Sequence, residues 1–162
     1  ARTCKIDKKR NRRLAWCTDV ISGIFMELVV DTSVVVAAIL KSGTTRNLLF
    51  NSFVKLYSPE RLEAELFKNK EKFKEYANLT DDEFNNAVEL VLKQIEIIPF
   101  EEYREKEPEA KSACRRDESD WTFVALALRL NIAIWSNDPD LLEGQNKVKV
   151  LSTSDLLRIL TG

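Results

Sequence analysis

Short apolar runs alternate with longer segments of helical period between residues 26 and 162, and this alternation restricts the fold more than any other feature. Apolar runs of strand length occur near residues 27–31, 54–58, 95–98, 132–136 and 148–151. Strands that alternate with helices form a mostly parallel sheet with helices packed on it. The sequence therefore predicts a single α/β domain.

Three of the segments between these runs predict helices. The first has polar capping residues at 80–82 and apolar side chains at helical spacing, namely Phe84, Ala87, Val88, Val91 and Ile95. The second, residues 121–130, is apolar almost all round and should be buried. The third is expected to start with Thr153 or Ser154 as its cap and to carry Leu156, Leu157 and Leu160.

The basic residues are unevenly distributed along the chain. Residues 1–25 contain seven Lys or Arg against two Asp, a net charge of +5, so the rest of this chain of net charge −1 carries −6. Met26, the only methionine, stands directly before the first expected strand. We therefore expect residues 1–25 to be a basic extension, non-native or disordered, and residues 26–162 to be one domain. A basic arm that binds nucleic acid and a signal peptide are alternatives for the extension, although polar residues interrupt its apolar stretch.

The chain contains no histidine, which excludes imidazole general bases, nucleophilic triads and nearly all catalytic zinc sites. Catalysis must therefore come from carboxylates, hydroxyls, Lys, Arg or a bound metal. Three widely spaced cysteines, Cys4, Cys17 and Cys114, argue against a disulfide framework and a structural zinc, so we expect a reducing, cytoplasmic environment. No run approaches the roughly 18 apolar residues that span a bilayer, so we expect a soluble protein with no membrane partner.

Polar side chains follow two of the expected strands. Asp31 and Ser33 follow the first, whereas Asn137, Asp138 and Asp140 follow the fourth. The carboxyl ends of the strands in an open α/β sheet border its functional crevice, so these side chains are candidates for a site. Helix capping would also explain Asp31 or Asp138 taken singly.

Two further acidic positions lie near expected helix starts. Asp117 and Asp120 are three residues apart and would share one face of a helical turn. Capping explains one Asp there, but two clustered carboxylates repel each other unless a cation lies between them. Glu65 follows the second strand and cannot share a helix face with Glu63, and its spacing alone assigns it no function.

In this order, the acidic segments resemble the motifs of the PIN-domain ribonucleases, the family that includes VapC-type toxins. The four matching segments are Val29-Val30-Asp31-Thr32-Ser33-Val34, Glu65-Leu66, Asp117-x-x-Asp120 and Ser136-Asn137-Asp138-x-Asp140-Leu141. The resemblance covers residues 27 to about 157. Ser33 stands where many members have Asn, and Ser136 stands where Thr is common.

The resemblance implies that residues 26–162 form a three-layer α/β/α sandwich with a central parallel sheet of four or five strands. It also implies a metal-dependent endoribonuclease whose products carry a 5′-phosphate and a 3′-hydroxyl. Carboxylates gathered in one crevice suit Mg²⁺ or Mn²⁺, and hydrolysis with such ions needs no histidine. The catalytic residues implied are Asp31, Glu65, Asp120 and Asp138. The metal ligands implied are Asp31, Asp117, Asp120, Asp138 and Asp140. The residues expected to position substrate, phosphate or water are Ser33, Ser136, Asn137, Arg115 and Arg116.

RNA is the substrate that the resemblance implies, and an antitoxin protein and a second copy of the chain are the implied partners. Basic side chains should flank the crevice of an acidic domain, and the candidates are Arg46, Lys68, Arg115 and Arg116. A catalytically weak PIN-like module that binds RNA or serves in an assembly is the alternative function. Haloacid-dehalogenase-like phosphatases fit less well because they need a second Asp where Ser33 stands, and receiver domains need an acidic pair near Leu28.

Overall fold

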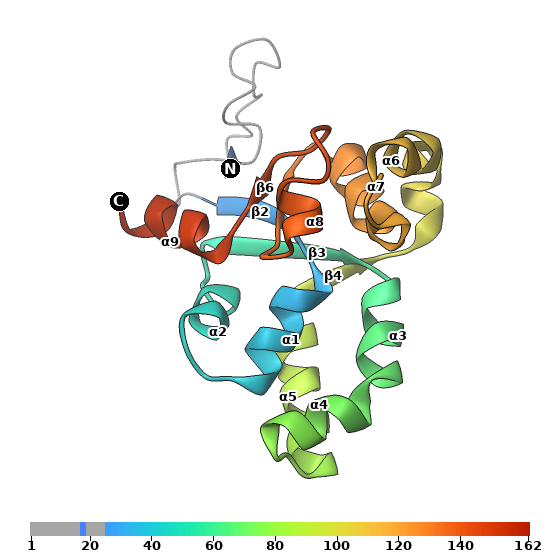
Figure 1. The fold of residues 1–162 in the computed structure, drawn as a ribbon. Helices are drawn as coiled ribbons and strands as arrows, with labels where there is room; N and C mark the ends of the chain where they lie inside the picture. The colour runs from blue at the N-terminus through green and yellow to red at the C-terminus, as the bar shows by residue number, and fades with distance from the viewer. Residues whose placement is uncertain (1–16, 19–24) are drawn as a thin grey trace.

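The computed structural model describes residues 17–18 and 25–162, and in them a central sheet lies between two layers of helices (Figure 1). The strands are β1 (Cys17–Thr18), β2 (Phe25–Val30), β3 (Val54–Pro59), β4 (Ile95–Ile98), β5 (Ala133–Trp135) and β6 (Val150–Leu151). The α-helices are α1 (Thr32–Leu40), α2 (Thr44–Leu49), α3 (Arg61–Lys68), α4 (Lys70–Ala77), α5 (Asp81–Leu92), α6 (Glu107–Ala113), α7 (Trp121–Leu130), α8 (Pro139–Leu142) and α9 (Thr153–Thr161). The short 3₁₀ helices are η1 (Phe100–Glu102), η2 (Arg104–Lys106) and η3 (Glu118–Asp120).

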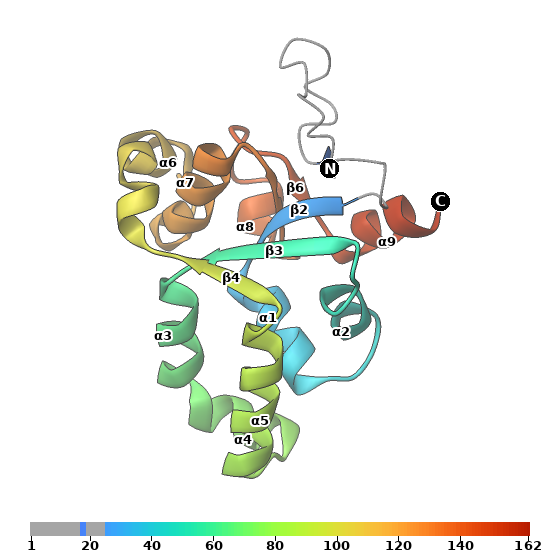
Figure 2. The same cartoon turned by 180° about the vertical axis from the view of Figure 1, so that it is seen from behind.

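Five strands run parallel, as the sequence predicts, and the structure places them in the order β4-β3-β2-β5-β6. Seen from behind, β4, β3 and β2 lie side by side (Figure 2). The chain builds β3 and β4 on one side of β2 and later adds β5 and β6 on the other. The strand order therefore reverses between β2 and β5, and open α/β sheets place their binding crevice at such a reversal.

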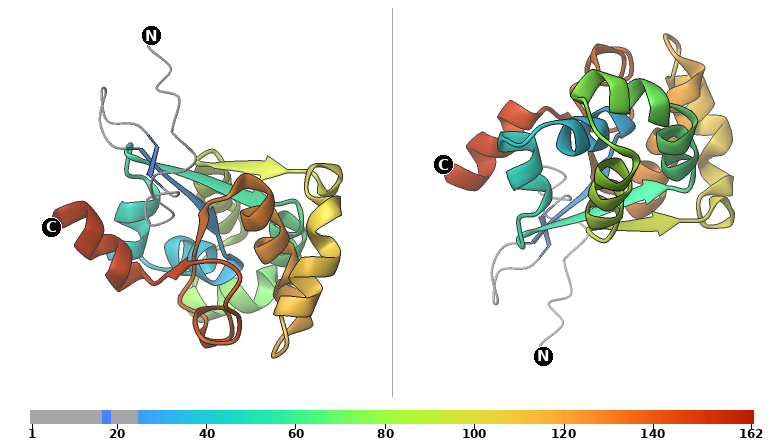
Figure 3. Two further views of the ribbon diagram at one scale, coloured as in Figure 1. Left: turned by 90° about the horizontal axis from the view of Figure 1, so that it is seen from above. Right: turned by 90° about the horizontal axis from the view of Figure 1, so that it is seen from below.

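Alternate residues of the strands enter two separate cores, which is how the sheet holds a helical layer on each face. Leu28 and Val30 of β2 pack in a core with α1, α2, α3, α5 and α9. Val29, between them, packs with α6, α7 and α8 on the opposite face. The views from above and below show these two layers on opposite sides of the strands (Figure 3). The three-layer α/β/α sandwich is thus confirmed.

Two helix boundaries differ from the sequence prediction. The helix predicted from Phe84 onward does begin at the Thr80 cap, which forms a capping box with Glu83, but it ends at Leu92 and does not include Ile95. Ile95 is instead the first residue of β4, which agrees with the strand predicted at 95–98. The last helix is capped by Ser152 rather than by Thr153 or Ser154. The reason is the position of Asp155, which completes a capping box only with the residue three positions before it.

The described part of the predicted extension contributes to the sheet. Cys17 and Thr18 pair antiparallel with Met26 and Phe25, so β2 begins two residues before the expected position. Residues 1–16 and 19–24, including Cys4, lie outside the described residues. The boundary at residue 25 stays a prediction. Within residues 17–18 and 25–162, no helix has the length and apolar character needed to cross a bilayer.

The fold predicts a large contrast between two leucines that both lie on helices. Leu66 on α3 is fully buried, whereas the side chain of Leu90 on α5 is 56% exposed. Leu66→Ala should lower the free energy of unfolding by about 2–5 kcal/mol, since it leaves a cavity, and Leu90→Ala should change it by less than about 0.5 kcal/mol. Urea unfolding followed by circular dichroism measures both. Equal losses would show that α3 does not pack on the core as described.

Candidate functional site

The site lies at the edge of the sheet where β2, β3 and β5 end, and α1 and α3 both begin at this edge (Figure 1). Asp31 directly follows β2 and is only 5% exposed. It occupies the N-cap position of α1, yet its side chain makes no capping hydrogen bond. Its Oδ2 atom instead accepts hydrogen bonds from Ser33 Oγ at 2.5 Å and from Ser136 Oγ at 2.7 Å. Capping therefore does not account for this carboxylate.

Ser136, which directly follows β5, connects the carboxyl ends of β2 and β5. Its fully buried hydroxyl donates to Asp31 and accepts from the backbone N–H of Asp138 at 3.0 Å. The carboxylate of Asp138 caps α8 by accepting from the N–H of Asp140 at 2.9 Å. The capping explanation thus holds for Asp138, while its position still places it on the same edge as Asp31.

Asp120 ends η3 at the start of α7 and carries the least compensated carboxylate of the site. Its Oδ2 atom is buried, and no hydrogen-bond partner for it occurs among the residues that the structure describes. Burial is the main cause that raises the pKa of Asp120 to about 7, and the negative charges of Asp31, Asp117, Asp138 and Asp140 contribute to the same rise. We call these five residues the site aspartates. The other four lie close enough to Asp120 to raise its pKa, which places them around it.

The pKa values of Asp31, Asp117 and Cys114, which lie near Asp120, shift for different reasons. Burial raises the pKa of Asp31, and the hydrogen bonds from Ser33 and Ser136 oppose that rise. Hydrogen bonding by Ser119 lowers the pKa of Asp117, and the charge of Arg61 lowers it further. Burial raises the pKa of the Cys114 thiol to about 11, with added repulsion from Asp120 and Asp117, so this buried cysteine stays a thiol near neutral pH.

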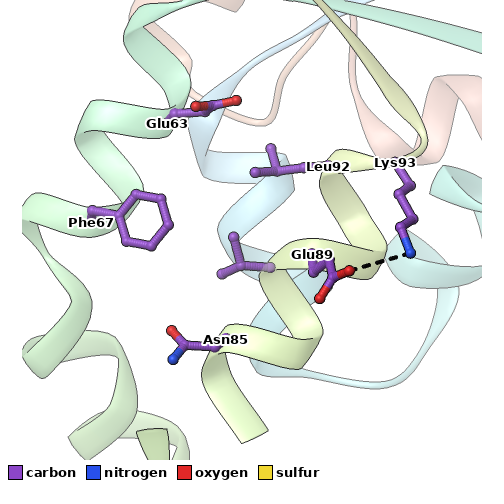
Figure 4. A pocket seen from close by; sticks show the side chains of 7 residues that line it. Glu63, Phe67, Asn85, Glu89, Leu92 and Lys93 are labelled. Carbon is purple, nitrogen blue, oxygen red and sulfur yellow. Dashed lines mark ion pairs between the residues drawn. The ribbon is translucent and has the colours of Figure 1, made fainter. Parts of the chain in front are cut away.

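Hydrogen bonds fix the carboxylate of Glu65 to one residue of α1 and to one residue of its own helix, α3. Thr32 Oγ1 donates to its Oε2 atom at 2.5 Å, and Arg61 Nε donates to its Oε1 atom at 2.6 Å. Arg61 Nη1 also donates to the carbonyl oxygen of Ser119, at 2.7 Å. The prediction that Glu63 cannot share the face of Glu65 is confirmed, because Glu63 lines a separate groove between α3 and α5 (Figure 4).

Sequence reasoning missed Thr32 and Arg61 as members of the site. Arg61 stands four residues before Glu65, a spacing that places the two side chains on one helix face. That spacing was a usable signal for the ion pair. The contact between Arg61 and Ser119 joins residues 58 positions apart, and no local pattern reveals it.

The basic and amide candidates divide into two groups. Arg115 and Arg116 are exposed beside Asp117, and Arg116 Nη1 lies 3.9 Å from Asp140 Oδ1. Arg46 was wrongly expected to flank the crevice, because it caps the far end of α1 by donating to two backbone carbonyl oxygens, those of Ala38 and Ile39. Lys68 is exposed in the last turn of α3, far along the helix from its site end. The amide of Asn137 exchanges two hydrogen bonds with Thr153 and is not brought among the site aspartates.

The raised pKa of Asp120 predicts how stability depends on pH. Its pKa rises from the ordinary 3.8 to about 7 on folding, so the folded protein binds the extra proton between these values. Its contribution to stability is therefore full below 3.8 and is lost as pH rises through about 7. In EDTA, Asp120→Asn should raise the free energy of unfolding at about pH 8 by on the order of 1 kcal/mol, allowing for solvent screening, and should change it little at about pH 4.

Thermal unfolding at both pH values measures this difference. Asp82→Asn is the matched control, because Asp82 is exposed at the start of α5, away from the site. A Asp120→Asn variant that is equally stable to the wild type at both pH values would contradict the assigned pKa.

Comparisons with known proteins address the family and the fold. A family model described as the PIN domain matches residues 29–157. A toxin-antitoxin complex from Klebsiella pneumoniae contains a chain with 11% identity and a TM-score of 0.58, covering 78% of this chain and 97% of that chain. VapBC2 from Rickettsia felis bound to a DNA fragment from its promoter gives 20% identity and a TM-score of 0.55, and the match covers 78% of this chain and 98% of that chain. These structures show a shared fold, and no curated protein gives a significant match. Since the family match spans most of its length, the chain belongs to the PIN-domain family.

Proposed function

We propose that this protein is a metal-dependent endoribonuclease that hydrolyses RNA phosphodiester bonds at the site aspartates. The observation that carries the proposal is the buried Oδ2 atom of Asp120, which has no hydrogen-bond partner among the described residues and is repelled by four neighbouring carboxylates. A divalent cation would remove both costs, since it offers the oxygen a partner and offsets the repulsion. Membership of the PIN-domain family supports the same activity.

Mg²⁺ or Mn²⁺ fits the available donors, because these are hard carboxylate oxygens and the chain has no histidine. Asp31, Asp120 and Asp138 would hold the ion, with Asp117 and Asp140 completing its surroundings. When bound, the ion would activate water and stabilise charge that develops on the phosphate oxygens. Among residues 17–18 and 25–162, no three acidic or thiol side chains form a ready-made site for one ion. Metal binding therefore requires the aspartate side chains to turn toward one another.

The chain's own residues would perform the remaining work. Ser33 and Ser136 fix the Asp31 carboxylate by hydrogen bonds, so it is oriented before substrate arrives. With a pKa of about 7, Asp120 would carry a proton in part of the molecules at neutral pH and would lose it when it serves as a ligand. Glu65, held by Thr32 and Arg61, would orient the attacking water. The exposed Arg115 and Arg116 would attract the phosphate backbone to an otherwise acidic edge.

Two partners belong to the proposal beside RNA. One of the similar solved structures is a toxin-antitoxin complex, which supports an antitoxin protein as a partner of this chain. A second copy of the chain, forming a homodimer, is the other. We further propose that residues 26–162 form the nuclease domain and that residues 1–25 precede it as a basic extension.

The lack of a ready-made metal site in the described residues favours a second candidate, a catalytically weak PIN-like module that binds RNA or serves in an assembly. The two candidates differ in their response to metal. A nuclease needs the ion for cleavage, whereas a binding module retains RNA affinity in EDTA.

Metal binding and cleavage can be tested together. Mn²⁺ should raise the melting temperature of the wild type, and Asp31→Asn should abolish most of that rise and lower cleavage by about a hundredfold or more, since it removes a charged ligand. Differential scanning fluorimetry and cleavage of a labelled RNA pool measure the two effects. Asp82→Asn, an exposed change on α5, should behave like the wild type. Wild-type protein that neither responds to Mn²⁺ nor cuts RNA would refute the nuclease proposal.

Toxicity is a separate prediction, because a nuclease need not be a toxin. Expression of the wild-type chain should stop the growth of a bacterial host, whereas Asp120→Asn, which removes a ligand charge, should permit growth at an equal protein level. Colony counts after induction, with protein levels checked by immunoblot, measure the effect. Co-expression of a small protein encoded next to this chain should restore growth if it is the antitoxin. Equal growth of wild type and variant would count against a toxin.

A further inference from the structure

Arg61 connects two acidic segments that are distant in the sequence. It is the first residue of α3, and its side chain is 37% exposed. Through Nε it donates to Glu65 on its own helix, and through Nη1 it donates to the carbonyl oxygen of Ser119. Ser119 lies between Asp117 and Asp120, so the second bond anchors the turn that carries both aspartates.

The connection continues from Glu65 to the first acidic segment. The other carboxylate oxygen of Glu65 accepts from Thr32, the residue that follows Asp31 and begins α1. One continuous chain of hydrogen bonds thus runs from the start of α1 through Glu65 and Arg61 to the turn before α7. Arg61 is the member that crosses between α3 and that turn.

The chemistry of the contact requires an arginine. The two acceptors are bonded by different nitrogens of one planar guanidinium, which presents several donors in a fixed arrangement. A lysine has one ammonium group and cannot reproduce two separate directions through a rigid fork. The Ser119 bond uses a backbone carbonyl rather than a carboxylate, so neutralisation of charge does not explain it.

We propose that Arg61 is a positioning residue that holds the turn of residues 117–120 against Glu65, so that Asp117 and Asp120 face Asp31. This inference rests on the proposed function, because its purpose is to set the distance between potential metal ligands. Partners that orient metal ligands typically change metal affinity or activity by about 10- to 100-fold when they are removed.

The test uses Arg61→Lys in the full chain, with Arg158→Lys as the matched control. Arg158 is 77% exposed on α9 and undergoes the same chemical change away from the site. Hydrogen exchange measured by mass spectrometry should show residues 115–121 exchanging about tenfold faster in Arg61→Lys, because the turn opens more often. Exchange in α5 should not change. The apparent Kd for Mn²⁺ should rise by about tenfold, and kcat for RNA cleavage should fall with little change in KM.

Each outcome decides between positioning and another role. Unchanged exchange at residues 115–121 in Arg61→Lys would overturn the proposal. An affinity of Arg61→Lys for Mn²⁺ equal to that of the wild type would also overturn it. A rise in KM with unchanged exchange would show instead that Arg61 contacts the RNA phosphate. Adding Glu65→Gln to Arg61→Lys should accelerate exchange little further, because both changes break one bridge. If the wild type cuts no RNA, the proposed function fails, while exchange and Mn²⁺ affinity still decide the role of Arg61.

Discussion

The adjacency of β2 and β5 is the constraint on which the rest of the site depends. Neighbouring parallel strands lie about 4.8 Å apart, so the residues that follow them emerge side by side. The pairing of Val30 with Trp135 sets this register, and the N–H of Asp31 continues it by donating to the carbonyl of Trp135 at 3.1 Å. Asp31 and Ser136 must therefore meet at the sheet edge. Their hydrogen bond makes burial of the Asp31 carboxylate tolerable.

Most of the site carboxylates have structural partners as well as a place in the proposed chemistry. Asp138 caps α8, Asp117 accepts from the N–H of Ser119 in its own turn, and Glu65 is bonded by Thr32 and Arg61. Capping and metal binding are thus not exclusive, because a carboxylate has lone pairs for both. Asp120 differs, since its buried Oδ2 atom has no such partner among the described residues. Asp120 is therefore the site carboxylate that a bound cation would stabilise most.

The sequence predicted those parts of the structure that depend on local patterns. The parallel strands, the buried α7 and the acidic residues at strand ends follow from apolar period and from the rule that strand ends meet. The sequence could not predict which group each polar side chain forms a hydrogen bond with. Arg46 is bonded to the end of α1 and Asn137 to Thr153, and both choices depend on helices that fold back from elsewhere in the chain. Ile95 fitted both the strand predicted at 95–98 and the spacing of the preceding helix, and its pairing with Leu56 in the sheet decides for the strand.

The absence of histidine acquires a physical meaning at Asp120. A catalytic site at neutral pH benefits from a group that exchanges a proton near neutrality, and imidazole is the side chain that does so unperturbed. Here burial and four neighbouring charges bring the pKa of a carboxyl group to about 7. The same repulsion opposes folding, so the two apolar cores on either side of the sheet must compensate for it. Burial of Asp120, together with the repulsion of the neighbouring aspartates, therefore gives this chain a carboxyl group whose pKa lies near neutrality, at the expense of stability rather than through the use of an imidazole.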